Sequence, residues 1–191
     1  ENNMTTRVAL VTGGIGGIGT SICRQLAQAG HRVATNYRDR AKAEAWQAAQ
    51  KADGFDFVIA SGDVSDVAAA EAMVREVEAK AGPVDILINN AGIPDAQRAH
   101  KMEVELIDRV LGVNLRAPYI LSCEVARRLM AAKKPGRIVN ISSVAHYSYS
   151  GNGAALYAIT KTAVARMTEA LSLEWAKYGI NVNAICPGMF K

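Results

Sequence analysis

Short apolar runs alternate with longer amphipathic segments along the whole chain. The apolar runs predict strands near residues 7–12, 31–37, 55–60, 84–89, 136–142 and 180–186. The amphipathic segments predict helices near residues 17–29, 40–53, 66–81, 103–132 and 154–178. An order in which strands and helices alternate is typical of a parallel sheet with helices on both faces.

Two of the predicted strands, 84–88 and 137–141, are almost continuously apolar. Parallel strands buried on both faces have this pattern, so we predict an α/β fold with a doubly wound parallel sheet. Such sheets bind ligands at the carboxyl ends of their strands. Candidate residues follow predicted strands at five places: Gly13, Asp63, Asn89, Ser143 and Pro187. No repeat or linker interrupts the sequence, so we expect one domain over residues 1–191.

Composition and charge narrow the class of protein. Half of the residues are hydrophobic and 21% are charged, which is ordinary for a globular domain. The net charge of +4 is spread without a basic run, so we expect no nucleic-acid partner. No apolar stretch approaches membrane-spanning length, and residues 1–6 are too polar for a signal peptide. We expect a cytoplasmic protein whose natural first residue is Met4.

The three cysteines, Cys23, Cys123 and Cys186, are widely separated and odd in number. They lie in apolar helix or strand patterns rather than at the short spacings of metal ligands. We therefore expect neither a disulfide framework nor a metal site, and we interpret the three residues as buried, reduced thiols.

A glycine-rich turn follows the first predicted strand. The apolar run Val8–Val11 ends in the segment 12–19, which contains five glycines, and a helical pattern follows. Strand, glycine turn and helix come in the order of a dinucleotide-binding unit, in which the glycines allow a tight turn and close approach of the backbone to a pyrophosphate. The alternative is a flexible turn in some other α/β protein.

Tyr157 and Lys161 stand four residues apart in a predicted helix. Residues at this spacing share one face of a helix, so an ammonium group would lie beside a phenol. A nearby cation lowers the pKa of a tyrosine from its usual value near ~10. Tyr157 would then become a usable proton donor or acceptor, although an isolated pair of this kind is more often a solvated helix face.

Seven motifs occur in one order along the chain: Thr12-Gly13-x-x-x-Gly17-Ile18-Gly19, Asp63 in 62–64, Asn89-Asn90-Ala91-Gly92, Asn114 in 113–115, Ser143 in 140–143, Tyr157-x-x-x-Lys161, and Pro187-Gly188. With them the chain resembles the short-chain dehydrogenase/reductase family over nearly its whole length, which implies a Rossmann-like fold. Within this family, segments 11–20 and 54–57 are most similar to acetoacetyl-CoA reductases.

The resemblance implies a role for each of four residues. Tyr157 would be the general acid in the reduction of a carbonyl, and Lys161 would lower its pKa and hold the cofactor ribose. Ser143 would donate a hydrogen bond to the carbonyl oxygen. Asn114 would anchor a water that relays protons toward Lys161, unless this lone polar residue merely caps or bends its helix.

The loop before Tyr157 departs from the family pattern. Residues 144–156 make the spacing from Ser143 to Tyr157 one residue longer than in familiar members, and we expect the extra residue to bulge within 147–153. We favour Ser143 over Ser142 as the catalytic serine. His146, Tyr147 and Tyr149 would line a substrate pocket, pack against a neighbouring subunit or lie on the surface.

The resemblance also implies the cofactor contacts: Gly13, Gly14, Ile15, Gly16, Gly17, Ile18, Gly19, Tyr37, Arg38, Arg40, Asp63, Val64, Asn90, Ala91, Gly92, Tyr157, Lys161, Pro187 and Gly188. Asp63 would reach the adenine amino group, stabilise a turn or cap a helix. Tyr37 takes the place where an NAD-specific enzyme has an acidic residue, and Arg38 or Arg40 could clamp a 2′-phosphate. We expect NADP(H) to be preferred and NAD(H) to be possible, since Gly16 and Asp39 weaken the preference.

We therefore expect NADP(H)-dependent reduction of a 3-oxoacyl thioester, such as acetoacetyl-CoA, to the 3-hydroxyacyl thioester. The alternatives are a 3-oxoacyl-carrier-protein reductase, a dehydrogenase of a sugar or small alcohol, and a non-catalytic dinucleotide-binding sensor or assembly subunit. Family members form homodimers or homotetramers and continue beyond the loop that begins at Pro187. We thus expect residues 1–191 to be a C-terminally incomplete domain that lacks the lid and the last strand.

Overall fold

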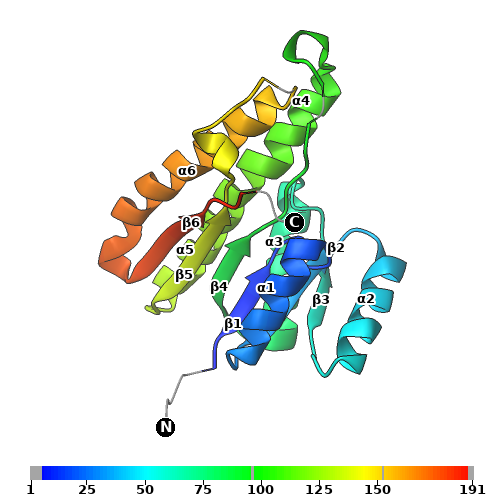
Figure 1. The fold of residues 1–191 in the computed structure, drawn as a ribbon. Coiled ribbons are helices and arrows are strands. Elements are labelled where there is room, and N and C mark those ends of the chain that lie inside the picture. Colours follow the sequence, from blue (N-terminus) through cyan, green and yellow to red (C-terminus); the bar gives the residue numbers. More distant parts are fainter. Residues whose placement is uncertain (1–5, 96, 152, 189–191) are drawn as a thin grey trace.

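The computed structural model describes residues 6–95, 97–151 and 153–188. Six parallel strands form one sheet in the order β3-β2-β1-β4-β5-β6 (Figure 1). The strands are β1 (Val8–Val11), β2 (Arg32–Tyr37), β3 (Val58–Ser61), β4 (Val84–Asn89), β5 (Gly136–Ile141) and β6 (Ile180–Ile185). The predicted doubly wound parallel sheet is confirmed. The predictions for Met4, Asn152 and residues 189–191 lie outside the described residues.

Helices connect the strands and cover both faces of the sheet. They are α1 (Gly17–Gln28), α2 (Arg40–Ala52), α3 (Val67–Ala81), α4 (Val104–Leu111), α5 (Ala117–Ala131) and α6 (Ala155–Trp175). Helices α3, α5 and α6 pack with the larger core cluster on one face, whereas α1 and α2 pack on the other (Figure 1). Short 3-10 turns η1 (Ala99–Lys101), η3 (Val144–His146) and η4 (Ala176–Tyr178) add to the predicted elements.

The helix predicted near 103–132 is present over residues 104–131, but it is not regular throughout. A π-helical turn, η2 (Gly112–Arg116), separates α4 from α5. Pro118 at the start of α5 has no N–H to donate to a carbonyl one turn earlier, so the regular ladder is interrupted there. The turn carries the buried residue Asn114, and π turns of this kind often occur at functional sites.

The third predicted strand was placed too early, because Phe55 and Phe57 serve another purpose. Their rings stack with centroids 5.6 Å apart, and Phe57 also stacks on Trp46 of α2 at 5.3 Å. This aromatic stack fixes α2 beside the edge of the sheet, and β3 begins only at Val58.

The prediction that all three cysteines are buried was also wrong. Cys23 is buried in the core between α1 and the sheet, but Cys123 and Cys186 are only partly buried. Cys123 lies on α5 at the margin of the larger core cluster, and Cys186 lies just beyond the edge strand β6, so neither position is fully covered. All three thiols are free.

Among the described residues, none of the helices is long and apolar enough to cross a membrane. Within the same residues, no three His, Cys, Asp or Glu side chains gather closely enough to hold a metal ion.

Candidate functional site

The turn between β1 and α1 is held by polar side chains of the neighbouring strand β2. The Gly13 N–H donates to Asn36 Oδ1 at 2.8 Å. The Gly14 N–H donates to Thr35 Oγ1, also at 2.8 Å. Gly13 has φ +66, a left-handed conformation that favours glycine, so the turn depends on this residue type. Two hydrogen bonds from β2 and the left-handed glycine therefore hold the turn in this shape.

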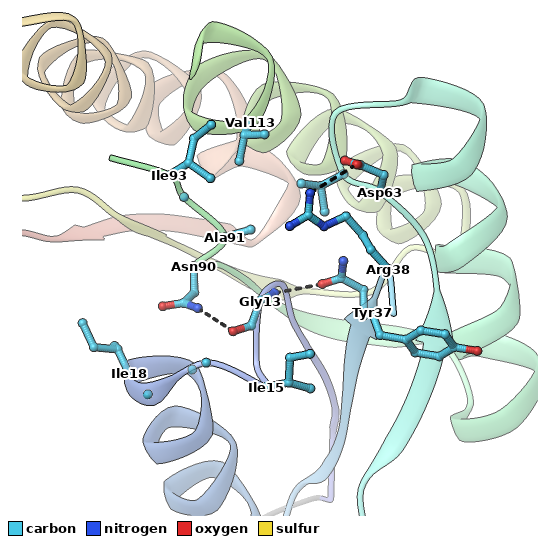
Figure 2. A pocket seen from close by; sticks show the side chains of 16 residues that line it. Gly13, Ile15, Ile18, Tyr37, Arg38, Asp63, Asn90, Ala91, Ile93 and Val113 are labelled. Carbon is cyan, nitrogen blue, oxygen red and sulfur yellow. Dashed lines mark hydrogen bonds and ion pairs between the residues drawn. The ribbon is translucent and has the colours of Figure 1, made fainter. Parts of the chain in front are cut away.

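The loop after β4 is joined to this turn. Asn90 Nδ2 donates to the carbonyls of Thr12 and Gly13 at 3.0 and 3.2 Å. In return, Thr12 Oγ1 accepts from the N–H groups of Asn90 and Ala91 at 3.1 and 3.0 Å. Figure 2 shows Asn90 pointing toward the Gly13 carbonyl across the floor of an open cleft.

This cleft, of about 590 Å³, runs along the carboxyl ends of β1, β2, β3 and β4. Its lining consists of Gly13, Ile15, Gly16, Gly17, Ile18, Gly19, Asn36, Tyr37, Arg38, Asp63, Val64, Asn90, Ala91, Gly92, Ile93 and Val113. At the start of α1, the cap residue Gly16 supplies no side-chain acceptor for the first amides of the helix. These N–H groups and the helix dipole favour a bound anion, so the cleft fits the pyrophosphate of a dinucleotide.

Arg38 and Asp63 form the far end of the cleft. The Arg38 guanidinium lies 3.7 Å from an Asp63 carboxylate oxygen, and Figure 2 shows the two side chains facing each other. Partial burial acts to raise the pKa of Asp63, but hydrogen bonds from Ser65 and the charges of Arg38 and Arg109 outweigh it, so the net pKa is lowered. Asp63 is therefore a carboxylate that accepts from Ser65 N–H at 2.9 Å in a turn, while Asp66 caps α3.

Of the other two residues predicted near the 2′-phosphate, Tyr37 lines the cleft and Arg40 does not. Tyr37 is buried along the wall of the cleft. Arg40 is outside the cleft lining: its guanidinium carbon lies 5.9 Å from the Tyr37 ring centroid, and its Nη1 lies 3.6 Å from a Glu44 oxygen. Of the two arginines predicted to clamp a phosphate, Arg38 is the one that the structure brings to the cleft.

A smaller cavity of about 300 Å³ adjoins the cleft. The two share the lining residues Ile18, Asn90, Gly92 and Ile93. The rest of the cavity lining is Pro94, Ile141, Ser142, Ser143, Tyr157, Lys161, Pro187 and Gly188. The structure thus brings together residues from the ends of β4, β5 and β6 with two side chains from α6.

Lys161 lies on the inner side of this cavity and is almost fully buried. Its Nζ donates to the Ile141 carbonyl at 2.7 Å and lies 5.5 Å from the Tyr157 ring centroid. Burial lowers the pKa of Lys161 from 10.5 to about 8, because it disfavours the charged ammonium. The ammonium is therefore held near the phenol, as the helical spacing predicts, and it gives up its proton unusually easily.

The two adjacent serines differ in exposure and in partners. Ser142 is buried, and its hydroxyl donates to the Lys161 carbonyl at 2.8 Å. Ser143 is partly exposed, and its hydroxyl oxygen accepts from the Ala145 N–H at 3.1 Å, which leaves the hydroxyl proton available. Both line the cavity, but only Ser143 can offer a proton to a ligand without breaking a bond within the protein.

Asn114 reaches the cavity wall from the π turn. Its Oδ1 accepts from the Ile93 N–H at 2.8 Å, and its Nδ2 donates to the Ile93 carbonyl at 2.9 Å. A Cβ placed on Gly92 would lie 3.5 Å from Asn114 Oδ1 and 3.6 Å from Lys161 Nζ. The Asn114 amide therefore holds the loop after β4. This amide and the Lys161 ammonium both lie close to Gly92.

His146 and Tyr149 line a different cavity from Ser143 and Tyr157. This second cavity, of about 660 Å³, lies between the loop 145–149 and the first half of α6. The Tyr149 hydroxyl accepts from the Gly153 N–H at 3.2 Å, and His146 Nδ1 lies 2.8 Å from the Ser143 carbonyl oxygen. The structure connects this loop to the 300 Å³ cavity through Ser143, but it does not place the two predicted side chains in that cavity.

Several supporting residues escaped the sequence predictions. Asn36 and Thr35 hold the glycine turn. Ser122 and Thr168 join Asn89 and Asn140, which lie within the predicted motifs, in a buried network that links β4, β5, α5 and α6. The available signal was a polar residue inside an apolar strand, since a buried amide or hydroxyl needs a partner.

Comparison with known proteins decides the family. The sequence profile of the family described as short chain dehydrogenase matches residues 7–191. The chain belongs to the short-chain dehydrogenase family. It is an oxidoreductase.

Similar proteins differ in their activities. Nodulation protein G of Azospirillum brasilense is 44% identical over 186 residues, which cover 97% of this chain and 75% of that protein. An acetoacetyl-CoA reductase of Allochromatium vinosum is 42% identical over 184 residues, 95% of this chain and 74% of the relative. A solved gluconate 5-dehydrogenase of Burkholderia cenocepacia, in complex with NADP and tartrate, has a TM-score of 0.89 at 36% identity and covers 98% of this chain and 73% of its own.

Proposed function

We propose that the protein uses NADPH to reduce a 3-oxoacyl thioester, of the acetoacetyl-CoA type, to the 3-hydroxyacyl thioester. The observation that carries this proposal is the junction between the dinucleotide cleft and the cavity. Gly92 and Ile93 line both, while Ser143, Tyr157 and Lys161 gather on the cavity side. The 42% identity to an acetoacetyl-CoA reductase supports the substrate class.

The bound cofactor would supply the hydride for the carbonyl carbon. Tyr157 would give its phenolic proton to the carbonyl oxygen, which becomes the product hydroxyl. Ser143 would donate its available hydroxyl proton in a hydrogen bond to the same oxygen, which gains negative charge during the reduction. A general acid and a hydrogen-bond donor on one oxygen are the chemical requirement of this reaction.

Lys161 and Asn114 would restore the proton of Tyr157. The buried ammonium has a pKa lowered to about 8, so it can release a proton near neutral pH and take one back. Asn114 Oδ1 keeps a second lone pair beyond its bond to Ile93, and it lies near Gly92 as Lys161 Nζ does. We propose that a water held there passes protons to Lys161, which also binds the cofactor ribose.

We propose a preference for NADP(H) on the basis of Arg38. Its guanidinium lies at the open end of the cleft, next to the end of β2, where a 2′-phosphate would lie. Asp63, 3.7 Å away, competes for the same guanidinium, so the preference is modest and NAD(H) can also be used. Similarity to a dehydrogenase solved with NADP supports this choice.

We also propose that the protein assembles as a homodimer or homotetramer. The outer faces of α5 and α6 expose Tyr119 and Leu173 beside an apolar groove. The rim of this groove carries Arg116 and Arg166 as well as Glu174, so a second copy related by a two-fold axis could pair opposite charges. Light scattering on the purified protein tests this proposal, and a monomer at micromolar concentration would contradict it.

A cofactor-oxidation assay tests the proposed reaction. NADPH oxidation would be followed with acetoacetyl-CoA, a 3-oxoacyl carrier protein, a free 3-ketoester and a keto sugar acid as separate substrates. We expect the highest kcat/KM with acetoacetyl-CoA. A higher value with the carrier protein or the sugar acid would identify one of the rival reductases. Cofactor binding without turnover of any carbonyl would instead support a non-catalytic sensor.

A further inference from the structure

Asp95 is a buried carboxylate in the loop after β4, and the reaction proposed above does not use it. Its exposed fraction is 4%. Its Oδ2 accepts a hydrogen bond from the backbone N–H of Tyr157 at 3.2 Å, across 62 positions of sequence. Its Oδ1 has no hydrogen-bond partner among the described residues. A buried carboxylate with one unpartnered oxygen is costly, so its presence calls for an explanation.

The start of α6 lacks a local cap. Ala154 stands at the cap position and has no side-chain acceptor, although the first amides of a helix need one. Tyr157 is the third residue of α6, and its N–H is the group that a capping Ser or Asp normally binds. Asp95 performs this capping from another segment, and its negative charge is favoured by the helix dipole.

The residues on either side of Asp95 are also held by hydrogen bonds. Two residues before Asp95, the main chain of Ile93 is held on both sides by the amide of Asn114. Three residues after it, Arg98 Nη1 donates to the Gly151 carbonyl at 2.8 Å, just before α6. Residues 92–95, with Arg98, thus join the wall shared by the cleft and the cavity to the start of the helix that carries Tyr157.

We propose that Asp95 is a positioning residue for Tyr157. The carboxylate fixes the Tyr157 backbone to the loop that forms the wall of the cofactor cleft, and so sets the distance between the phenol and the reacting carbonyl. This inference rests on the proposed function of Tyr157 as the proton donor. Loss of the bond would let the first turn of α6 fray away from the wall, and small misplacements of reacting groups lower rates steeply.

Three variants separate positioning from ordinary stabilisation. Asp95→Ala removes the cap, and Asp95→Asn keeps an oxygen that can accept from the Tyr157 N–H. Asp66→Ala is the matched control, since Asp66 caps α3 in the same way, accepting from the Ala69 N–H at 2.8 Å, and lies outside the catalytic machinery. For each full-length variant, kcat, KM, the cofactor Kd and the thermal midpoint would be measured with NADPH and acetoacetyl-CoA.

We expect Asp95→Ala to lower kcat by about ten- to a hundredfold, with KM and the cofactor Kd changed less than about twofold. Asp95→Asn should restore kcat to within about threefold of the wild type, because Asn caps helices nearly as well as Asp. Asp66→Ala should lower the thermal midpoint about as much as Asp95→Ala does, yet leave kcat unchanged. The proposal is overturned if Asp95→Ala keeps more than half of the wild-type kcat, or if Asp66→Ala loses as much.

Hydrogen exchange at the Tyr157 amide supplies a readout that does not depend on activity. We expect exchange to be about tenfold faster in Asp95→Ala than in the wild type and nearly unchanged in Asp95→Asn. If Asp95→Ala does not fold, Asp95→Val takes its place, because valine also lacks an acceptor for this N–H. Equal exchange rates would refute the connection between the two residues. A wild-type protein that turns over no carbonyl would refute the proposed function, whereas the exchange rates would still decide whether Asp95 holds Tyr157.

Discussion

The loops after β1 and β5 both lie at the carboxyl edge of the sheet, but they are held in different ways. The glycine turn after β1 is bonded to side chains from β2 and from the loop after β4, and it is fixed at Gly13 and Gly14. The segment after β5 is longer and more exposed, with Tyr147 71% exposed. Its described residues bond to one another and to Ser143, Pro187, Thr162 and Arg98. A turn that binds the same cofactor in every turnover suits such a bonded arrangement, whereas an exposed loop can vary without disturbing the sheet.

The largest expected effect lies in the catalytic cavity. Tyr157→Phe removes the proton donor while keeping the ring, so kcat with acetoacetyl-CoA should fall by about 10²–10⁴-fold. The cofactor Kd should remain nearly unchanged, because the glycine turn and Arg38 are untouched. Steady-state NADPH oxidation and a fluorescence titration of NADPH binding measure the two quantities.

Lys161→Ala completes this test. Since Lys161 is proposed to bind the ribose as well as to supply protons, this variant should lose both turnover and cofactor affinity. A Tyr157→Phe enzyme with more than about a tenth of the wild-type kcat would remove Tyr157 from the mechanism. A folded Tyr157→Phe enzyme that fails to bind NADPH would show instead that the rate is lost through cofactor binding.

The next effect concerns the buried ammonium of Lys161. In the folded protein its pKa is about 8, whereas in the unfolded chain it is near 10.5. Between these values the unfolded chain binds more protons, so raising the pH stabilises the folded state. Relative to Lys161→Met, the free energy of unfolding of the wild type should rise by up to about 3 kcal/mol between pH 8 and pH 10.5.

Urea denaturation of both apoproteins across this range measures the difference, since groups common to the two variants cancel. A difference that does not change with pH, or that falls, would mean that Lys161 is charged and well solvated in the folded protein. The lowered pKa of Lys161 would then be incorrect, and the proposed release of a proton from this ammonium near neutral pH would fail with it.

Much of the fold could be predicted because each strand is a local apolar run and each turn has a local signal. The π turn could not be, because it depends on bonds from Asn114 to Ile93, which belongs to a separate loop, and on the proline at 118. The start of β3 was missed for a similar reason. Phe55 and Phe57 have the pattern of a strand, but packing against Trp46 overrides that local preference.

The residues of the candidate site also differ in whether the sequence alone could locate them. Residues with a motif of their own, such as Gly13 and Tyr157, could be located from spacing and family resemblance alone. Asn36 and Asp95 could not, because each acts on a backbone group far away in sequence, 23 and 62 positions respectively. Side chains of the loop 145–149 were the least predictable, since their cavity depends on how that loop folds against α6.

A smaller effect is expected in the glycine turn, where a substitution at one position should lower stability and a substitution at another should lower cofactor affinity. A Cβ at position 19 would lie 2.3 Å from the Gly13 carbonyl oxygen and 2.7 Å from Gly14 Cα. Because these are backbone atoms, Gly19→Ala should destabilise the apoprotein by about 1–3 kcal/mol in urea denaturation. Gly17→Ala is the matched variant, since no atom lies within 4 Å of its Cβ.

We expect Gly17→Ala to keep or slightly raise the stability of the apoprotein, because alanine is the better helix residue by about 1 kcal/mol. Its cofactor affinity should fall, since position 17 lines the cleft. Equal stabilities for the two variants would show that the turn can rearrange, contrary to the view of it as a fixed platform.

The smallest effect should come from the exposed end of the cleft. Arg38→Gln removes the guanidinium proposed to bind the 2′-phosphate, and KM for NADPH should rise about tenfold, since loss of a charge-assisted hydrogen bond at an exposed site costs about 1.4 kcal/mol. KM for NADH should hardly change, because that cofactor has no 2′-phosphate. Arg40→Gln is the control: Arg40 lies over Tyr37 outside the cleft lining and pairs with Glu44, so this variant should leave both values within about twofold.

A larger loss of NADPH use in Arg40→Gln than in Arg38→Gln would move the phosphate contact to the start of α2. Equal losses with NADH and NADPH would instead show that Arg38 supports the Asp63 turn, so that cofactor choice is made by the backbone rather than by this side chain.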